Sequence, residues 1–116
     1  MARPQVTVRV DDQVVCERCL VADRPWARMR GLLGRSELPR GEGIFLRPAG
    51  SIHTFFMRFP IDVAFCDRDG TVLRTTCLRP WRISPLVANA AFAIEAESGA
   101  FERWGLRVGD QVEVKE

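Results

Sequence analysis

The chain has 116 residues and a hydrophobic fraction of 47%, which suffices for one globular domain around one core and excludes a disordered chain. Its 17 basic and 15 acidic residues leave a formal net charge of +2, and the arginines form no cluster of the kind that follows a nucleic-acid backbone. No stretch reaches the roughly 20 apolar residues that span a bilayer, and no apolar run follows the basic start. We therefore expect a soluble, cytoplasmic protein that binds neither nucleic acid nor membrane.

The first part of the chain is expected to hold a β-hairpin and one helix. Valines alternate with other residues between positions 6 and 15 and are interrupted by two aspartates, a pattern that predicts an N-terminal hairpin. Asp23 is a candidate N-cap for a short amphipathic helix that runs through Arg35, with a proline in its first turn. The stretch 36–43 contains one proline and two glycines and should be a loop.

Strand patterns dominate the rest of the chain. Pro60 separates two of the expected strands because proline cannot donate to a ladder, and Asp67-Arg68-Asp69-Gly70 predicts a hairpin turn. Residues 98–104 fit one or two helical turns. The expected strands are 44–46, 51–57, 61–66, 71–78, 90–96 and 111–114. The sequence thus predicts a single β-dominated α+β domain over residues 1–116, with a curled or barrel-like, mostly antiparallel sheet and one short amphipathic helix packed beside it.

Six short motifs follow one another at characteristic distances along the chain. They are Arg28-x-x-Gly31-Leu32-Leu33-Gly34-Arg35, Glu42-Gly43-Ile44-Phe45, Met57-Arg58-Phe59-Pro60-Ile61-Asp62-Val63, Asp67-x-x-Gly70, Ile94-Glu95-x-x-x-Gly99 and Gly105-Leu106-x-x-Gly109-Asp110. Their order and spacing resemble the domain-of-unknown-function family 192, small proteins of bacteria and archaea, over roughly residues 15–115. The resemblance implies a β-rich domain with few helices and brings no agreed activity. Many members have tryptophan where this chain has Phe56.

The only histidine, His53, lies in the apolar stretch 51–57. Strand alternation places Ser51, His53, Phe55 and Met57 on one face, and the core on the other. The first face is expected to form one wall of a pocket, in which a histidine can serve as base, acid or ligand. The more frequent alternative is a histidine at a strand end that is hydrogen-bonded or half exposed.

Asp62 stands between two apolar residues of an expected strand. A carboxylate in such a place must be exposed or paired, and the alternation turns it away from the expected core. Arg58 and Arg35 are candidate partners, because a guanidinium group can bind a carboxylate with two hydrogen bonds. A structural pair of this kind is the first expectation. A pair that orients His53 or binds a ligand is the alternative.

Two further groups of polar residues carry weaker predictions. Cys16 and Cys19 have a C-x-x-C spacing, but Cys66 and Cys77 are eleven positions apart and supply no matching pair for zinc. A zinc or redox role is therefore a minor alternative, and no metal or cofactor is expected. Glu95 falls on one face of an expected strand and should be solvated.

Two function classes remain from the sequence. The first is a non-catalytic binding or accessory module whose pocket near residues 51–62 holds a small polar or anionic ligand or a peptide. The alternative is a small hydrolase-like enzyme, with His53 as general base oriented by Asp62 and Arg35 stabilising an oxyanion. The candidate site residues are Arg35, His53, Phe55, Met57, Arg58 and Asp62. The sequence leaves open the ligand, the oligomeric state and the state of the first two cysteines.

Overall fold

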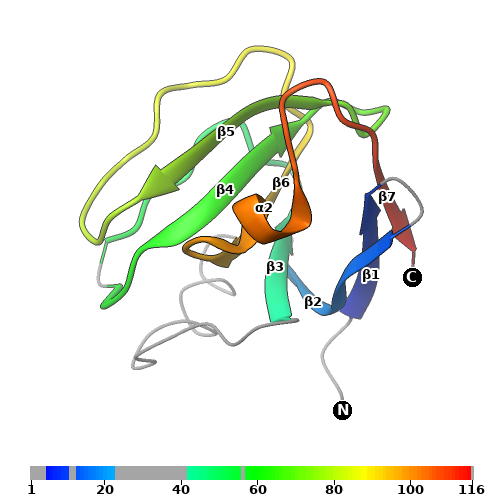
Figure 1. Ribbon diagram of the computed structural model, residues 1–116. Coiled ribbons are helices and arrows are strands. Elements are labelled where there is room, and N and C mark those ends of the chain that lie inside the picture. Colours follow the sequence, from blue (N-terminus) through cyan, green and yellow to red (C-terminus); the bar gives the residue numbers. More distant parts are fainter. Residues whose placement is uncertain (1–4, 11–12, 23–41, 56, 116) are drawn as a thin grey trace.

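A computed structural model of the chain describes residues 5–10, 13–22, 42–55 and 57–115 (Figure 1). It contains seven strands and the short helix α2, in the order β1 (Gln5–Val10), β2 (Gln13–Ala22), β3 (Glu42–Leu46), β4 (Ile61–Cys66), β5 (Val72–Leu78), β6 (Phe92–Glu97), α2 (Ala100–Trp104) and β7 (Val112–Lys115). The described part of the chain holds no helix that is long and apolar enough to cross a membrane.

All seven strands belong to one sheet, in the spatial order β5-β4-β6-β3-β2-β1-β7. Every neighbouring pair is antiparallel except β2 and β3, which run parallel. The sheet curls until its two edge strands meet at a corner, where the Val112 N–H donates to the Gly70 carbonyl at 2.8 Å. Gly70 has a φ of 90°, and a Cβ there would lie 2.3 Å from the Val112 carbonyl oxygen, so this corner requires glycine. The curled, mostly antiparallel sheet confirms the predicted fold class, although the sheet does not close into a barrel.

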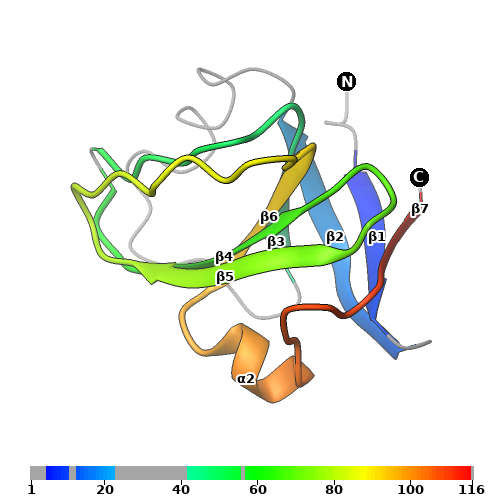
Figure 2. The same ribbon diagram turned by 90° about the horizontal axis from the view of Figure 1, so that it is seen from above.

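The central strands are buried on both faces, and β4 is buried along its whole length. Odd-numbered β4 residues belong to the loop cluster, which consists of Ile44, Leu46, Ala49, Ile52, Met57, Phe59, Ile61, Val63, Phe65, Leu78 and Ala93. The even-numbered Ala64 and Cys66 belong to the α2 cluster, which also contains Val8, Val10, Cys16, Cys19, Phe45, Val72, Phe92, Ile94, Ala96, Ala100, Phe101, Leu106 and Val112. Figure 2 shows α2 on one side of β4 and β5 and the connecting loops on the other.

Most strands predicted from the sequence are confirmed to within two residues, and the helical turn expected at 98–104 is α2. The predicted amphipathic helix from Asp23 to Arg35 lies outside the described residues. The predicted strand at 51–57 is wrong, since among its described residues only His53 forms a bridge, to Ile83. The chain turns after this bridge, where the Met57 N–H donates to the Thr54 carbonyl. This turn ends the alternation of faces on which the strand prediction rested.

Candidate functional site

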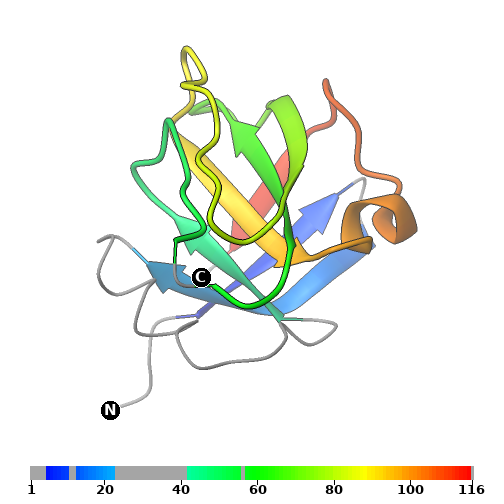
Figure 3. The ribbon, with the colours of Figure 1, turned by 90° about the vertical axis from the view of Figure 1, so that its left-hand side faces the viewer.

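Two loops pair with each other beside the main sheet. We call residues 47–60 the first loop and residues 79–91 the second loop, and they run side by side in Figure 3 and again in Figure 2. The Thr54 N–H donates to the Arg82 carbonyl at 2.8 Å, and the Ser84 N–H donates to the Ile52 carbonyl at 2.7 Å. The bridge between His53 and Ile83 lies between these two bonds. The loops therefore form a short, irregular antiparallel pair.

Thr54 is the centre of this pairing. Its side chain is fully buried, and Oγ1 donates to the Arg79 carbonyl at 2.6 Å and accepts the Arg82 N–H at 2.8 Å. Its carbonyl accepts the Trp81 N–H at 2.9 Å. One residue of the first loop thus fixes the backbone of residues 79–82 in the second.

The rings held by this pairing lie at the surface. His53 stacks on Phe55 with 4.9 Å between ring centroids, and the centroid of Trp81 lies 6.2 Å from that of Phe55. Trp81 is 55% exposed and Ile83 is 66% exposed. We call His53, Phe55, Trp81 and Ile83 the aromatic patch. Trp81 has a φ of 62°, which is uncommon for a bulky residue and indicates that the surrounding hydrogen bonds determine its position.

The chain around the aromatic patch is positively charged. Residues 43–61 and 70–94 contain no aspartate or glutamate. The five basic residues in these two ranges are all arginines that are exposed, namely Arg47, Arg58, Arg74, Arg79 and Arg82. Three of these arginines, Arg58, Arg79 and Arg82, lie in the two loops themselves, so the loops combine apolar rings with positive charge, a composition that favours acidic partners.

The structure brings together only part of the predicted pocket. His53 and Phe55 belong to the aromatic patch, and Arg58 is exposed in the same loop. Met57 is 5% exposed and packs in the loop cluster, so it lies apart from the exposed rings, and its place in the wall of a pocket stays a prediction. The turn after Thr54 directs it into the core. Arg35 lies outside the described residues.

Asp62 has a structural role that the sequence did not indicate. Its Oδ2 accepts the N–H of Gly99 at 3.0 Å and that of Phe101 at 3.1 Å, so this carboxylate holds the start of α2. Of the expected arginine partners, Arg58 is exposed in the first loop and Arg35 lies outside the described residues, so the pairing of Asp62 with an arginine stays a prediction. Asp62 is one of the even-numbered residues of β4, whose side faces α2. The first loop covers the other side of β4 (Figure 2). The structure does not bring Asp62 and His53 together.

Glu95 is fully buried, so the expectation of a solvated glutamate is wrong. It lies on β6 between Ile44 of β3 and Val63 of β4, which both belong to the loop cluster. Glu95 lies on the strand face opposite Phe92, as the alternation predicted, but this face is covered as well. The apolar run of β4, interrupted only by Asp62, was the available indication that both faces of the sheet are buried.

The side chains of Cys16 and Cys19 lie on one face of β2, although residues three apart on a regular strand point to opposite faces. A β-bulge explains this, because Val8 pairs with Cys16 and Val6 with Cys19, which sets three steps on β2 against two on β1. Neither residue forms a disulfide, and both sulfurs lie over Gly43, where an added Cβ would be 3.2 Å from the Cys16 sulfur and 3.1 Å from the Cys19 sulfur. The hydrogen bond with Cys16, reinforced by burial, raises the pKa of the Cys19 thiol far above its usual value.

Among the described residues, no group of three or more histidine, cysteine, aspartate or glutamate side chains is arranged to hold a metal ion. The thiol pair is buried in the α2 cluster, and the aromatic patch is exposed beyond the opposite face of β4. Of the features described so far, the patch therefore has the exposure and the charge that binding requires.

The chain resembles proteins whose activity is not assigned. The model of the DUF192 family, described as "Uncharacterized ACR", matches residues 6–114. A UPF0127 protein of Pyrococcus furiosus is 35% identical over 97 residues, covering 79% of this chain and 82% of the relative. A UPF0127 protein of Pyrococcus abyssi is 44% identical over 63 residues, and this match spans about half of each chain, 54%.

Two crystal structures share the fold. One is a protein of unknown function from Novosphingobium aromaticivorans, with a TM-score of 0.76 and 23% identity, which covers 94% of this chain and 83% of that one. The other is described as a putative transcription regulator from Sinorhizobium meliloti, with a TM-score of 0.75 and 20% identity, which covers 97% of this chain and 94% of that one. At these identities the likeness concerns the fold alone. The family model, which matches nearly the whole chain, shows that this protein belongs to the DUF192 family.

Proposed function

We propose that this protein is a non-catalytic binding module that docks an acidic peptide segment on the aromatic patch. The observation that carries the proposal is the pair of exposed rings, Phe55 and Trp81, with the half-buried His53 stacked on Phe55, within two stretches of chain that contain arginines and no carboxylates. An aromatic or aliphatic side chain of the peptide would pack on the exposed rings. Its carboxylates would pair with Arg58, Arg79 or Arg82.

The patch has the physical properties of a binding surface. Tryptophan and arginine contribute most to binding energy at protein interfaces, and here they lie on adjacent positions, Trp81 and Arg82. The hydrogen bonds from Thr54 hold this part of the second loop in one conformation. A preformed surface loses little conformational entropy on binding, which supports affinity for a short segment.

The geometry favours binding over hydrolysis. The enzyme hypothesis requires the Asp62 carboxylate to orient His53, but that carboxylate accepts two N–H groups at the start of α2 on the other side of β4. The features that surround His53 are a stacked ring and a paired loop. These features suit the binding of a side chain of a partner.

Polymers of defined composition test the proposal. Binding of the intact chain to the copolymer poly(Glu,Tyr), to poly-glutamate and to poly-lysine is measured by isothermal titration calorimetry. We expect poly(Glu,Tyr) to bind more tightly than poly-glutamate, because it supplies rings as well as charge, and poly-lysine not to bind. Affinity for both acidic polymers should fall with salt, because the arginine contacts are at the surface.

Four variants locate the binding. Trp81→Ala should remove the advantage of poly(Glu,Tyr) over poly-glutamate, and Arg82→Gln should weaken both. Val108→Ala and Arg107→Gln are the matched controls, since Val108 is 61% exposed and Arg107 is exposed, both outside the two loops. The proposal fails if poly(Glu,Tyr) binds no better than poly-glutamate, or if the controls weaken binding as much as Trp81→Ala does.

A further inference from the structure

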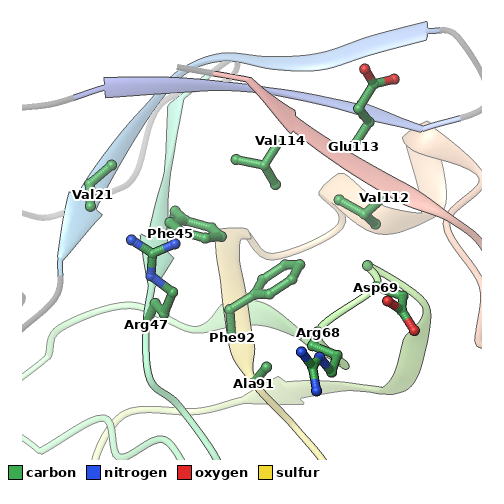
Figure 4. Close-up of a pocket in the computed structure, with 11 residues that line it drawn as sticks. Val21, Phe45, Arg47, Arg68, Asp69, Ala91, Phe92, Val112, Glu113 and Val114 are labelled. Atoms are coloured by element: carbon green, nitrogen blue, oxygen red, sulfur yellow. The ribbon is translucent and has the colours of Figure 1, made fainter.

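A cleft of about 590 Å³ opens on the α2-cluster side of the sheet, between β7 and the strands β3 and β6 (Figure 4). It arises because the curled sheet leaves a space between its β7 edge and its central strands. Its apolar wall is formed by Val21, Phe45, Ala91, Phe92, Val112 and Val114. The volume falls in the range of small-molecule sites, and the mouth of a curled sheet is a frequent place for them.

Two rings line the cleft. The centroids of Phe45 and Phe92 are 5.0 Å apart with their planes at 47°, so one ring presents its edge obliquely to the other. Arg47, just beyond β3, places its guanidinium carbon 5.8 Å from the Phe45 centroid. This contact holds one cation beside the apolar wall, where the charge is close to any ligand that packs on the rings.

The charges around the cleft favour a ligand with one negative charge. Arg47 and Arg68 line it together with Asp69 and Glu113. Glu113 is paired with Lys115 at 3.4 Å, so its charge is already compensated. Two arginines then face a single aspartate, and the cleft has one positive charge in excess. A monoanion compensates this excess, whereas a dianion would exceed it.

We propose that the cleft is a second binding site, which takes a small amphiphilic carboxylate with an aromatic or aliphatic body. The body packs on Phe45 and Phe92, and the carboxylate is bound by Arg47 and Arg68. The site shares no residue with the aromatic patch. Binding in the cleft can therefore be tested independently of the proposed peptide binding.

The test uses 3-phenylpropionate as probe and compares it with 3-phenylpropylamine, 3-phenylpropanol and inorganic phosphate. Binding to the ¹⁵N-labelled chain is followed by chemical-shift changes, at the millimolar concentrations that a ligand of this size requires. We expect saturable shifts at β3, β6 and β7 with phenylpropionate. The alcohol should bind more weakly, and the amine and phosphate should cause no saturable shifts there.

Variants assign the contacts. Arg47→Gln and Arg68→Gln should each weaken phenylpropionate binding about tenfold, because each removes one charge-assisted contact. Arg74→Gln is the matched control, since Arg74 is exposed on β5 and does not line the cleft. Ala91→Leu, which fills the cleft without changing its charge, should abolish binding.

Several results would overturn the proposal. They are saturable binding of the amine or of phosphate as strong as that of phenylpropionate, shifts that map away from β3, β6 and β7, unchanged affinity in Arg47→Gln and Arg68→Gln, or no saturable shift with phenylpropionate at all. If Ala91→Leu does not fold, the arginine variants, whose side chains are exposed, still decide the question.

Discussion

The Trp81 backbone N–H donates to the Thr54 carbonyl at 2.9 Å, and this bond fixes an exposed indole to a fully buried residue of another loop. Without it, the left-handed backbone at Trp81, with a φ of 62°, would be free to relax to a more common conformation. The position of the most exposed ring of the aromatic patch is therefore determined from within the protein.

The Thr54 hydroxyl should be required for the order of the second loop. Thr54→Val keeps the shape of the side chain but leaves the Arg79 carbonyl and the Arg82 N–H without this partner. We expect the free energy of unfolding in urea to fall by about 1–3 kcal/mol, the usual cost of unsatisfied buried polar groups. Thr75→Val, on the edge strand β5, is the control. Equal stability of Thr54→Val and the wild type would show that the hydroxyl is not needed.

The Asp62 carboxylate should stabilise α2. Asp62→Ala removes the acceptor of two N–H groups, those of Gly99 and Phe101, and should lower the free energy of unfolding by about 2–3 kcal/mol. Asp62→Asn keeps one oxygen and should cost less. Hydrogen exchange of the α2 amides measures the local effect, and Asp69→Asn, at an exposed position, is the comparison. Unchanged exchange of these amides in Asp62→Ala would contradict the assigned role.

Gly43 should not tolerate a side chain. An added Cβ would lie 2.7 Å from the Glu95 carbonyl oxygen and within 3.2 Å of both sulfurs of Cys16 and Cys19, so the strands β2, β3 and β6 would have to move. We expect Gly43→Ala to cost about 1–3 kcal/mol, as overpacked cores do. Gly50→Ala is the matched control, because the nearest neighbour of an added Cβ there would be a flexible Leu86 side-chain carbon at 3.4 Å. Urea unfolding of both variants measures the difference.

Stability should fall at alkaline pH because of the Cys66 thiol. Burial, with a smaller effect of Asp67, raises the pKa of this thiol from 9.0 to about 12. Below pH 9 the thiol is protonated in both states. Between pH 9 and 12 the unfolded chain loses the proton while the folded chain keeps it, so the free energy of unfolding falls by up to about 1.4 kcal/mol per pH unit. Above pH 12 this contribution is lost and the curve levels.

Urea unfolding between about pH 8 and pH 11, the range in which a thiol of the unfolded chain titrates, checks the alkaline prediction. The chain has no tyrosine and one lysine, so the other groups that titrate in this range are chiefly its other cysteines, among which Cys19 also has a raised pKa and adds to the slope. Cys66→Ala should therefore reduce the slope, whatever its effect on the absolute stability. Cys77→Ala, at an exposed position, is the control. An identical slope in Cys66→Ala and the wild type would mean that other groups cause the loss.

Much of the fold could be predicted because its signals are local. Strand β4 is an uninterrupted apolar stretch except for Asp62, with Pro60 before it and a turn sequence after it. The helix α2 lies between Gly99 and Gly105, which both adopt the left-handed conformation that glycine favours. Such patterns depend on neighbouring residues alone, and most of the strands they predicted lie within two residues of those observed, although β2 runs on to Ala22.

The site could be predicted less well, because its contacts join distant parts of the chain. Asp62 binds an amide 37 positions later, and no rule of spacing relates the two. Alternation predicted the exposure of Phe55 but failed at Met57, where a hydrogen-bonded turn intervenes. Trp81 was missed, although a large aromatic residue next to Pro80 and Arg82 in a stretch without acids was a usable indication of a surface role.

The β-bulge in β2 has a consequence for how the length of this chain can change. It places three steps of β2 opposite two of β1, and a second irregularity between Val8 and Arg9 sets two steps of β2 against one of β1, so the strand already carries two residues more than a regular pairing needs. Deletion of Glu17 would restore regular alternation and leave Cys16 and Cys19 facing the same way, and the parallel pairing with β3 begins only at Arg18. An inserted residue would have no such compensation. Evolution can therefore delete one residue at this point while the side chains of the following part of the strand stay on the same faces of the sheet.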